Sequence, residues 1–411
     1  MGGLVLALGG CASDEPDRAP SADPAPTSAG SPTADDFTEP ALAVGITEPN
    51  PAFVWSARER PSLAAPFEAW RDELSVIDPD HYRLVVDWGA LQPDPARPAD
   101  LDQPQGGCMR ATPPCLGWLG LREQLAALAS RQATGGWETL VVLTGTPEWA
   151  ATPPHPCERD DATPRARAPR PDALPAYRRL VVDVLAAARQ EGARLHWWSA
   201  WNEPNHPASL SPQHDPCADR ASTPAVAGYA QLVGELRAAL DEAPGEQDFV
   251  LGELAGIHRS GRYSTGLEEF FAALPSEQVC AAEVIALHAY AGGRDPVNRV
   301  WRTLARHECD DGPQVWITET GAGFPPRALS VAQMSVSREE ACDAMHARLR
   351  RWHRDPRVGV AMQYTFREDD LFRVGLASTG LDVAFPTLAL WQAWGGARRP
   401  GEPPPVGVCS A

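Results

Sequence analysis

Residues 195–205 read LHWWSAWNEPN, an apolar run that stops at a polar, acidic motif. Residues 315–321 have the same form and read VWITETG. Short apolar runs bounded by polar residues are typical of strands buried on both faces. Each of these predicted strands carries a glutamate at its carboxyl end, Glu203 in the first and Glu319 in the second.

Similar runs recur along the chain. The eight predicted strands are 42–46, 82–88, 138–144, 195–201, 248–254, 283–288, 314–318 and 358–366. Between them lie segments with helical spacing, such as 119–131, 174–190 and 224–240. Alternating strands and helices favour a parallel sheet, and eight such units predict an α/β protein with a (β/α)8 TIM barrel as a single domain over 41–411.

The composition fits a folded protein with a large core. The chain has 411 residues, of which 43% are hydrophobic, and its 36 basic and 54 acidic residues give a net charge of −18. This negative field opposes binding to nucleic-acid phosphate. We therefore expect no nucleic-acid partner, and we expect a monomer.

The N-terminus resembles a bacterial lipoprotein signal. Residues 1–10 are apolar or small and run directly into Cys11. Cleavage before Cys11 and its lipidation would anchor the protein to the outside of the cell membrane without spanning it. Residues 11–40, rich in Ala, Pro and Ser, would then be a disordered linker. Two alternatives stay open for this segment: the start codon is placed too late, or residues 1–10 are an ordinary apolar N-terminus followed by a chance cysteine.

Eight cysteines remain after Cys11, an even number that predicts disulfides in an exported protein. The long segments 93–117, 150–171 and 206–223 follow strands two to four and belong to the catalytic face of a barrel. Disulfides would pin these loops, and the remaining cysteines lie near strand starts or near the C-terminus. The proposed pairs are Cys108–Cys115, Cys157–Cys217, Cys280–Cys309 and Cys342–Cys409. Neither Cys-x-x-Cys nor His-Glu-x-x-His occurs, so no metal or cofactor is expected.

Glu203 and Glu319 lie three strands apart and would face each other across the barrel mouth. Glycoside hydrolysis needs such a pair, one carboxylic acid to protonate the leaving oxygen and one carboxylate on the other side of the sugar.

At these residues the chain resembles the clan A glycoside hydrolases, retaining (β/α)8 enzymes with Asn-Glu-Pro after strand four and a nucleophilic glutamate after strand seven. Within the clan, the motifs Trp-Asn-Glu-Pro-Asn and Ile-Thr-Glu are most similar to family 39, with family 5 as the nearest alternative. The resemblance implies that Glu203 is the general acid/base and Glu319 the nucleophile, and that Asn202 binds the neighbouring sugar hydroxyl. Glu203 would then hold a proton while Glu319 stays ionised.

Further residues fit the same resemblance. Arg83, in RLVVDWGALQP, resembles a second-strand arginine that binds the nucleophile, and His288 and Tyr290, in LHAY, resemble a sixth-strand pair that orients nucleophile and substrate. Trp149 follows the third strand and could stack on a sugar. The eighth strand departs from the family 5 pattern, because Tyr364 stands near the place of an expected tryptophan.

Glu48 and Asn50, after the first strand, are candidates for a distal subsite or for structural roles. The predicted activity is retaining hydrolysis of an oligo- or polysaccharide. Two alternatives stay open: a transglycosylase on the same scaffold, and a carbohydrate-binding surface lipoprotein without catalysis.

Overall fold

Eight parallel strands close into a barrel in chain order in the computed structural model, so the predicted (β/α)8 fold is confirmed. The structure describes residues 42–55, 67–103, 120–219, 221–291, 293–309, 312–323, 331–368, 373–396 and 407–410. The strands are β1 (Ala43–Thr47), β2 (His81–Asp87), β3 (Glu138–Thr144), β4 (Trp197–Ser199), β5 (Asp248–Leu254), β6 (Val284–His288), β7 (Gln314–Thr320) and β8 (Val358–Tyr364).

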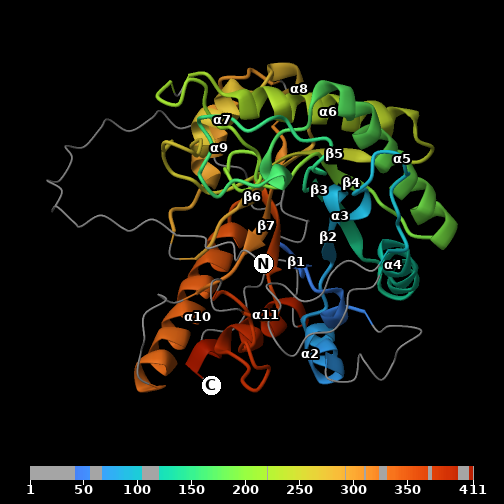
Figure 1. Cartoon of the computed structure of the whole chain (residues 1–411). Coiled ribbons are helices and arrows are strands. Elements are labelled where there is room, and N and C mark those ends of the chain that lie inside the picture. Colours follow the sequence, from blue (N-terminus) through green and yellow to red (C-terminus); the bar gives the residue numbers. More distant parts are fainter. Residues whose placement is uncertain are drawn as a thin grey trace, which may run out of the picture.

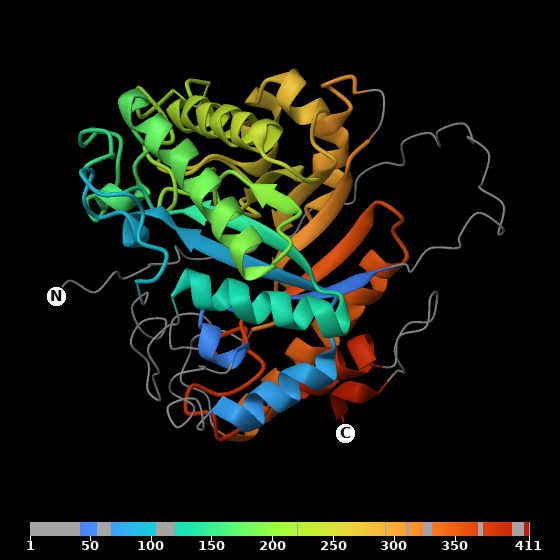
Figure 2. The same cartoon turned by 90° about the vertical axis from the view of Figure 1, so that its right-hand side faces the viewer.

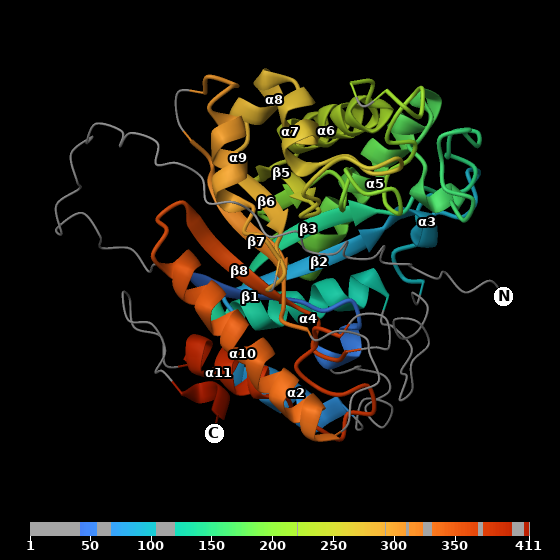
Figure 3. The same cartoon turned by 90° about the vertical axis from the view of Figure 1, so that its left-hand side faces the viewer.

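Helices surround the barrel (Figure 1). They are α2 (Glu68–Ile77), α3 (Trp88–Leu91), α4 (Leu121–Gly135), α5 (Leu174–Glu191), α6 (Pro224–Glu242), α7 (Leu267–Ala273), α8 (Ser276–Cys280), α9 (Val297–Leu304), α10 (Val331–His353) and α11 (Pro386–Gly396). Short 3-10 turns are η1 (Pro51–Phe53), η4 (Pro164–Ala166), η5 (Pro171–Ala173) and η6 (Val408–Ser410). Helix α11 packs against both α2 and α10, which closes the helical layer between the two ends of the chain (Figure 3).

The barrel interior is packed with side chains. Val142, Val250, Trp316 and Met362 belong to one buried apolar cluster inside it. A second and larger cluster fills the space between strands and helices. Burial of both strand faces explains why the strands read as continuous apolar runs. The filled interior leaves the carboxyl ends of the strands as the place for a site.

Strand β4 is shorter than predicted, because the chain leaves the regular ladder after Ser199. The amide of Asn202 donates to Leu143 O at 3.0 Å, and the amide of Glu203 donates to Glu253 O at 2.9 Å. Glu203 has a φ of 44°, in the left-handed region. The β4 end is therefore bonded to the ends of β3 and β5 in a local geometry that places Glu203 outside the strand.

The structure places three of the four predicted cysteine pairs in disulfides, Cys157–Cys217, Cys280–Cys309 and Cys342–Cys409. The first joins the loops that follow β3 and β4. The predicted pair Cys108–Cys115 and the predicted lipidation site Cys11 lie outside the described residues. Within the described part of the chain, no helix combines the length and apolar character needed to cross a membrane.

Candidate active site

Glu203 and Glu319 meet at the carboxyl end of the barrel. Glu203 follows β4, and Glu319 is the next-to-last residue of β7, as the sequence predicted. One carboxylate oxygen of each lies within 4.8 Å of the other. The Glu203 side chain is 24% exposed and that of Glu319 10%, so the pair lines the mouth of the barrel with one partly open carboxylate.

Arg83 and Tyr290 hold Glu319 from two sides. Arg83 of β2 donates from Nη1 to Glu319 Oε1 at 2.8 Å, and the Tyr290 hydroxyl donates to Glu319 Oε2 at 2.8 Å. The other terminal nitrogen of Arg83, Nη2, donates to Asn202 Oδ1 at 2.6 Å. Arg83 is only 2% exposed. Its charge therefore acts on Glu319 with little screening by solvent.

His288 lies between the two glutamates. Its Nδ1 is 2.9 Å from Glu203 Oε1 and 3.3 Å from Glu319 Oε2. Burial lowers the pKa of His288, but the nearby carboxylates of Glu319, Glu203 and Glu253 outweigh it and raise the pKa to about 10. The ring is therefore an imidazolium at neutral pH.

Glu253 is the site residue that the sequence analysis missed. It is fully buried, and its Oε2 lies 2.5 Å from Arg83 Nη2 and 3.1 Å from His288 Nε2. Burial raises its pKa, but Arg83 and His288 outweigh this and hold the pKa below its ordinary value. Strand β5 changes register between Gly252 and Leu254, and both Gly252 and Glu253 have positive φ. A signal was present, since a charged residue in a predicted buried strand needs an ionic partner.

The pKa order of the two glutamates in the free site is the reverse of the expected one. Burial raises the pKa of Glu203, but the bond to His288 and its charge lower it to about 2. Burial and the charge of Glu203 raise the pKa of Glu319, whereas the charges of His288 and Arg83 lower it. The net result is a pKa above the ordinary value. The expected proton on Glu203 is therefore not favoured in the free site, because the charge of His288 lowers the pKa of Glu203.

The remaining predicted residues differ in their relation to this network. Tyr364, partly buried at the end of β8, has its ring 6.5 Å from that of Tyr290. Trp149 donates from Nε1 to Gln92 O at 2.8 Å, and its half-buried ring packs edge-on against Trp88. Tyr364 therefore borders the site, whereas the indole N–H of Trp149 fastens a loop.

Glu48 and Asn50 have structural roles in the described part of the chain. Glu48 is buried and accepts from the amide of Asn50 at 2.8 Å and from the amide of Phe366 at 2.6 Å. Asn50 is also buried, and its side chain accepts from the amide of Ala52. Burial raises the pKa of Glu48 to about 7. These contacts join the ends of β1 and β8 and leave the two side chains facing protein atoms.

Among the described residues, two groups of side chains have the spacing of metal ligands. In the first, His155, Cys157 and Asp215, the cysteine is in a disulfide and offers no thiolate. The second consists of Glu203, His288 and Glu319. There the Arg83 guanidinium already binds Glu319, and a metal cation beside this positive charge would be repelled.

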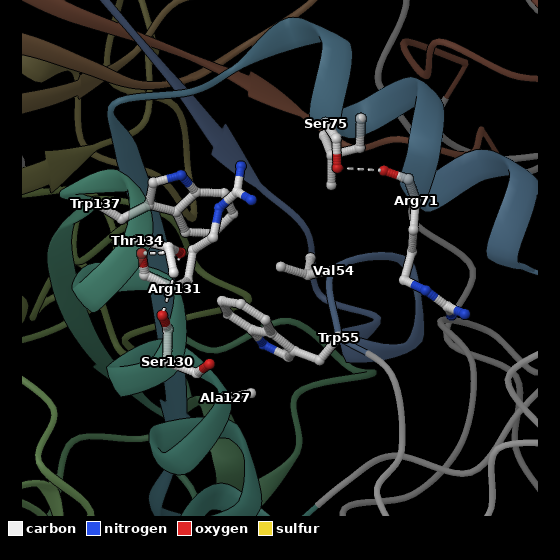
Figure 4. A pocket seen from close by; sticks show the side chains of 10 residues that line it. Val54, Trp55, Arg71, Ser75, Ala127, Ser130, Arg131, Thr134 and Trp137 are labelled. Atoms are coloured by element: carbon white, nitrogen blue, oxygen red, sulfur yellow. Dashed lines mark hydrogen bonds between the residues drawn. The ribbon is translucent and has the colours of Figure 1, made fainter.

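A cavity of about 270 Å³ lies on the flank of the barrel, between α2 and α4, which run side by side (Figure 2). Figure 4 shows Arg71 and Ser75 of α2 on one side, and Arg131 of α4 with Trp137 on the other. None of the predicted site residues lines it. This cavity is separate from the carboxylate network.

Comparisons with known proteins support the fold. No protein-family model matches the chain, and no curated protein matches it. Among solved structures, a conserved exported protein from Bacteroides fragilis is 12% identical with a TM-score of 0.57, over 90% of this chain and 81% of that one. A GH5_18 from Bifidobacterium longum subsp. infantis is 15% identical with a TM-score of 0.51, over 88% and 80%.

A GH39 beta-xylosidase from Caulobacter crescentus is likewise 15% identical, with a TM-score of 0.51, over 87% of this chain and 72% of that one. Identities this low show a shared fold and leave the activity to be argued from the site. The chain is thus a (β/α)8 barrel of the architecture found in these glycoside hydrolase structures.

Proposed function

We propose that the protein is a retaining glycosidase in which Glu319 is the nucleophile and Glu203 the general acid/base. The observation that carries this proposal is the separation of the two carboxylates, whose nearest oxygens lie within 4.8 Å. Retaining enzymes hold their carboxyl groups about 5 Å apart, whereas inverting enzymes leave roughly 6.5–9.5 Å for a water molecule.

In the first step, Glu319 attacks the anomeric carbon while Glu203 protonates the leaving oxygen. Arg83 and Tyr290 orient the Glu319 carboxylate through one bond to each oxygen. The proton for Glu203 is held in the free site by His288, whose Nδ1 lies 2.9 Å away. When substrate excludes water from the mouth, charge separation between Glu203 and His288 becomes costlier, which favours a proton on Glu203.

In the second step, Glu319 is an ester and carries no charge. The repulsion that raises the pKa of Glu203 next to an ionised Glu319 is then absent. Glu203 therefore accepts a proton from water, which attacks the anomeric carbon and releases the sugar with retained configuration.

Intact-protein mass spectrometry tests this assignment. The signal-free protein, its Glu319→Gln variant and the control Glu148→Gln are incubated with 2-deoxy-2-fluoro glycosides that carry good leaving groups. Glu148 is an exposed glutamate in the loop after β3, so its loss leaves the pair intact. We expect a mass increase of one glycosyl unit in the parent and control only. Tight oligosaccharide binding with no adduct from any glycoside would instead favour the non-catalytic alternative.

We further propose that the protein works outside the cytoplasm, anchored through a lipidated Cys11. The three disulfides support an oxidising compartment. Metabolic labelling with an alkyne fatty acid should mark the parent and spare Cys11→Ala. Equal labelling of both would exclude lipidation at this cysteine.

A further inference from the structure

Two loops at the carboxyl end of the barrel carry exposed arginines without acidic partners. They are the β5–α7 loop, residues 255–266, and the described part of the β6–α9 loop, residues 289–291 and 293–296, which lead to α7 and α9 in Figure 1. Arg259, Arg262 and Arg294 are exposed. In the described part of the chain, no carboxylate oxygen lies within 4.0 Å of their guanidinium nitrogens.

The loop after β3, on the same face, shows the opposite pattern. Each of its described arginines from 159 to 170 forms an ion pair with a carboxylate. The pairs are Arg159–Asp161, Arg165–Asp87, Arg167–Glu158 and Arg170–Asp172. On this face, the described arginines of the β3 loop are therefore neutralised by carboxylates, whereas Arg259, Arg262 and Arg294 are not.

The two loops are fixed to the proposed catalytic residues. Asn205, two residues after Glu203, donates from Nδ2 to Ala255 O at 3.0 Å and to Thr265 O at 3.2 Å, and it accepts from the amide of Ala255 at 2.8 Å. These bonds close the base of the β5–α7 loop. Arg294 lies four residues after Tyr290, near the end of the other loop.

His258 connects the two loops and lies in a positive field. Arg294 donates from Nη1 to His258 Nε2 at 2.6 Å. Arg299 donates to His258 O and forms an ion pair with Glu268. Burial and the positive charges of Arg299, Arg294 and Arg259 lower the pKa of the His258 imidazole. The His258 ring accepts from Arg294, and the arginines supply the positive charge of the two loops.

We propose that Arg259, Arg262 and Arg294, here called the basic rim, bind the carboxylate or sulfate groups of an anionic polysaccharide. This inference rests on the proposed glycosidase function, and it names the substrate class of that site. A guanidinium binds such planar anionic groups through two parallel hydrogen bonds. The overall charge of −18 opposes unspecific attraction of polyanions, so binding needs a local basic surface.

Affinity electrophoresis of the full chain tests the basic rim. Glu319→Gln serves as the parent, so that no probe is consumed during the run. The probes are polygalacturonate for carboxylate, dextran sulfate for sulfate, and laminarin and xylan as neutral polymers. The triple variant Arg259→Gln, Arg262→Gln, Arg294→Gln is compared with Arg189→Gln, which removes an exposed arginine from α5.

We expect the parent to bind polygalacturonate or dextran sulfate in preference to the neutral polymers, with an affinity that falls as salt rises. Each exposed ion pair contributes up to about fivefold in affinity, so the triple variant should bind about tenfold more weakly or worse. Arg189→Gln should bind like the parent. Equal binding by the triple variant and the parent would overturn the inference. So would the absence of binding to either polyanion in 50 mM salt, where the Debye length is about 14 Å.

The two proposals fail separately. Binding of a polyanion through the basic rim, with no glycosyl adduct from any fluorosugar, would refute the glycosidase and leave the rim in place. An adduct from a neutral glycoside, with no polyanion binding, would refute the rim and leave the glycosidase in place.

Discussion

Replacement of Glu253 by glutamine should weaken the whole carboxylate network, although Glu253 is hidden from solvent. The variant keeps the shape of the side chain and removes one negative charge that lies 2.5 Å from Arg83 and 3.1 Å from His288. Removing one partner from a buried ionic cluster costs roughly 3–5 kcal/mol. We therefore expect the free energy of unfolding at pH 6 to fall by about this amount.

The pH dependence gives this prediction a second readout. The pKa of folded His288 is raised from 6.5 to about 10, so the stability it contributes is complete below pH 6.5 and is lost as the pH rises toward 10. Three carboxylates lie within 3.3 Å of this ring. Loss of one should lower the folded pKa by about one unit, or about 1.4 kcal/mol. The destabilisation should therefore be largest near pH 6 and shrink by about that amount toward pH 10.

Chemical denaturation from pH 6 to pH 10 measures both effects. Glu242→Gln is the matched control, because Glu242 forms an exposed ion pair with Arg178, and such pairs contribute at most about 1 kcal/mol. In Glu253→Gln, the alkaline limb of the pH–rate profile for hydrolysis should also move to lower pH. A variant as stable as the parent at pH 6, with an unchanged alkaline limb, would refute the role of Glu253.

Three other predictions concern the site and its loops. Glu319→Ala should lose turnover and regain it with azide to give an inverted product, while Glu203→Ala with azide should give a retained product; the reverse stereochemistry, measured by NMR, would exchange the roles. Replacing Cys157 and Cys217 together by serine opens a loop with a sequence separation of 60 and should lower the unfolding free energy by about 4 kcal/mol; an unchanged denaturation midpoint would contradict this. Asn205→Ala removes three buried hydrogen bonds and should cost roughly 3 kcal/mol, seen as a lower melting temperature, and a melting temperature equal to that of the parent would show that the loop base is held otherwise.

The sequence predicted the barrel and the positions of Glu203 and Glu319 because both follow from local pattern. An apolar strand that ends in a glutamate puts that glutamate at the barrel mouth once eight strands close the sheet. Glu253 lies within such a run, in FVLGEL, where a charged residue indicates a buried ionic partner but does not identify it. Its position depends on the register change after Gly252 and on contacts with residues from β2 and β6, which are far away in sequence.

The same limit applies to the pKa order of the two glutamates. The sequence analysis placed Arg83 beside Glu319, but it gave His288 only an orienting role. The geometry brings the His288 ring within 2.9 Å of Glu203, and two further carboxylates keep that ring charged. Charge states in a buried cluster depend on every member, so a pairwise expectation from motifs was insufficient.

Counting the charges of the cluster shows what the third carboxylate contributes. Before attack, the proton has passed from His288 to Glu203, so both are neutral, and Arg83 faces ionised Glu319 and Glu253 at a net charge of −1. In the glycosyl-enzyme, Glu319 is neutral as an ester and Glu203 is ionised, so the net charge is again −1. Arg83 has lost the charge of one of its two acidic partners at this stage, and an unpaired buried guanidinium would be costly. On the proposed mechanism, Glu253 keeps a negative charge 2.5 Å from Arg83 in both states, without touching the sugar.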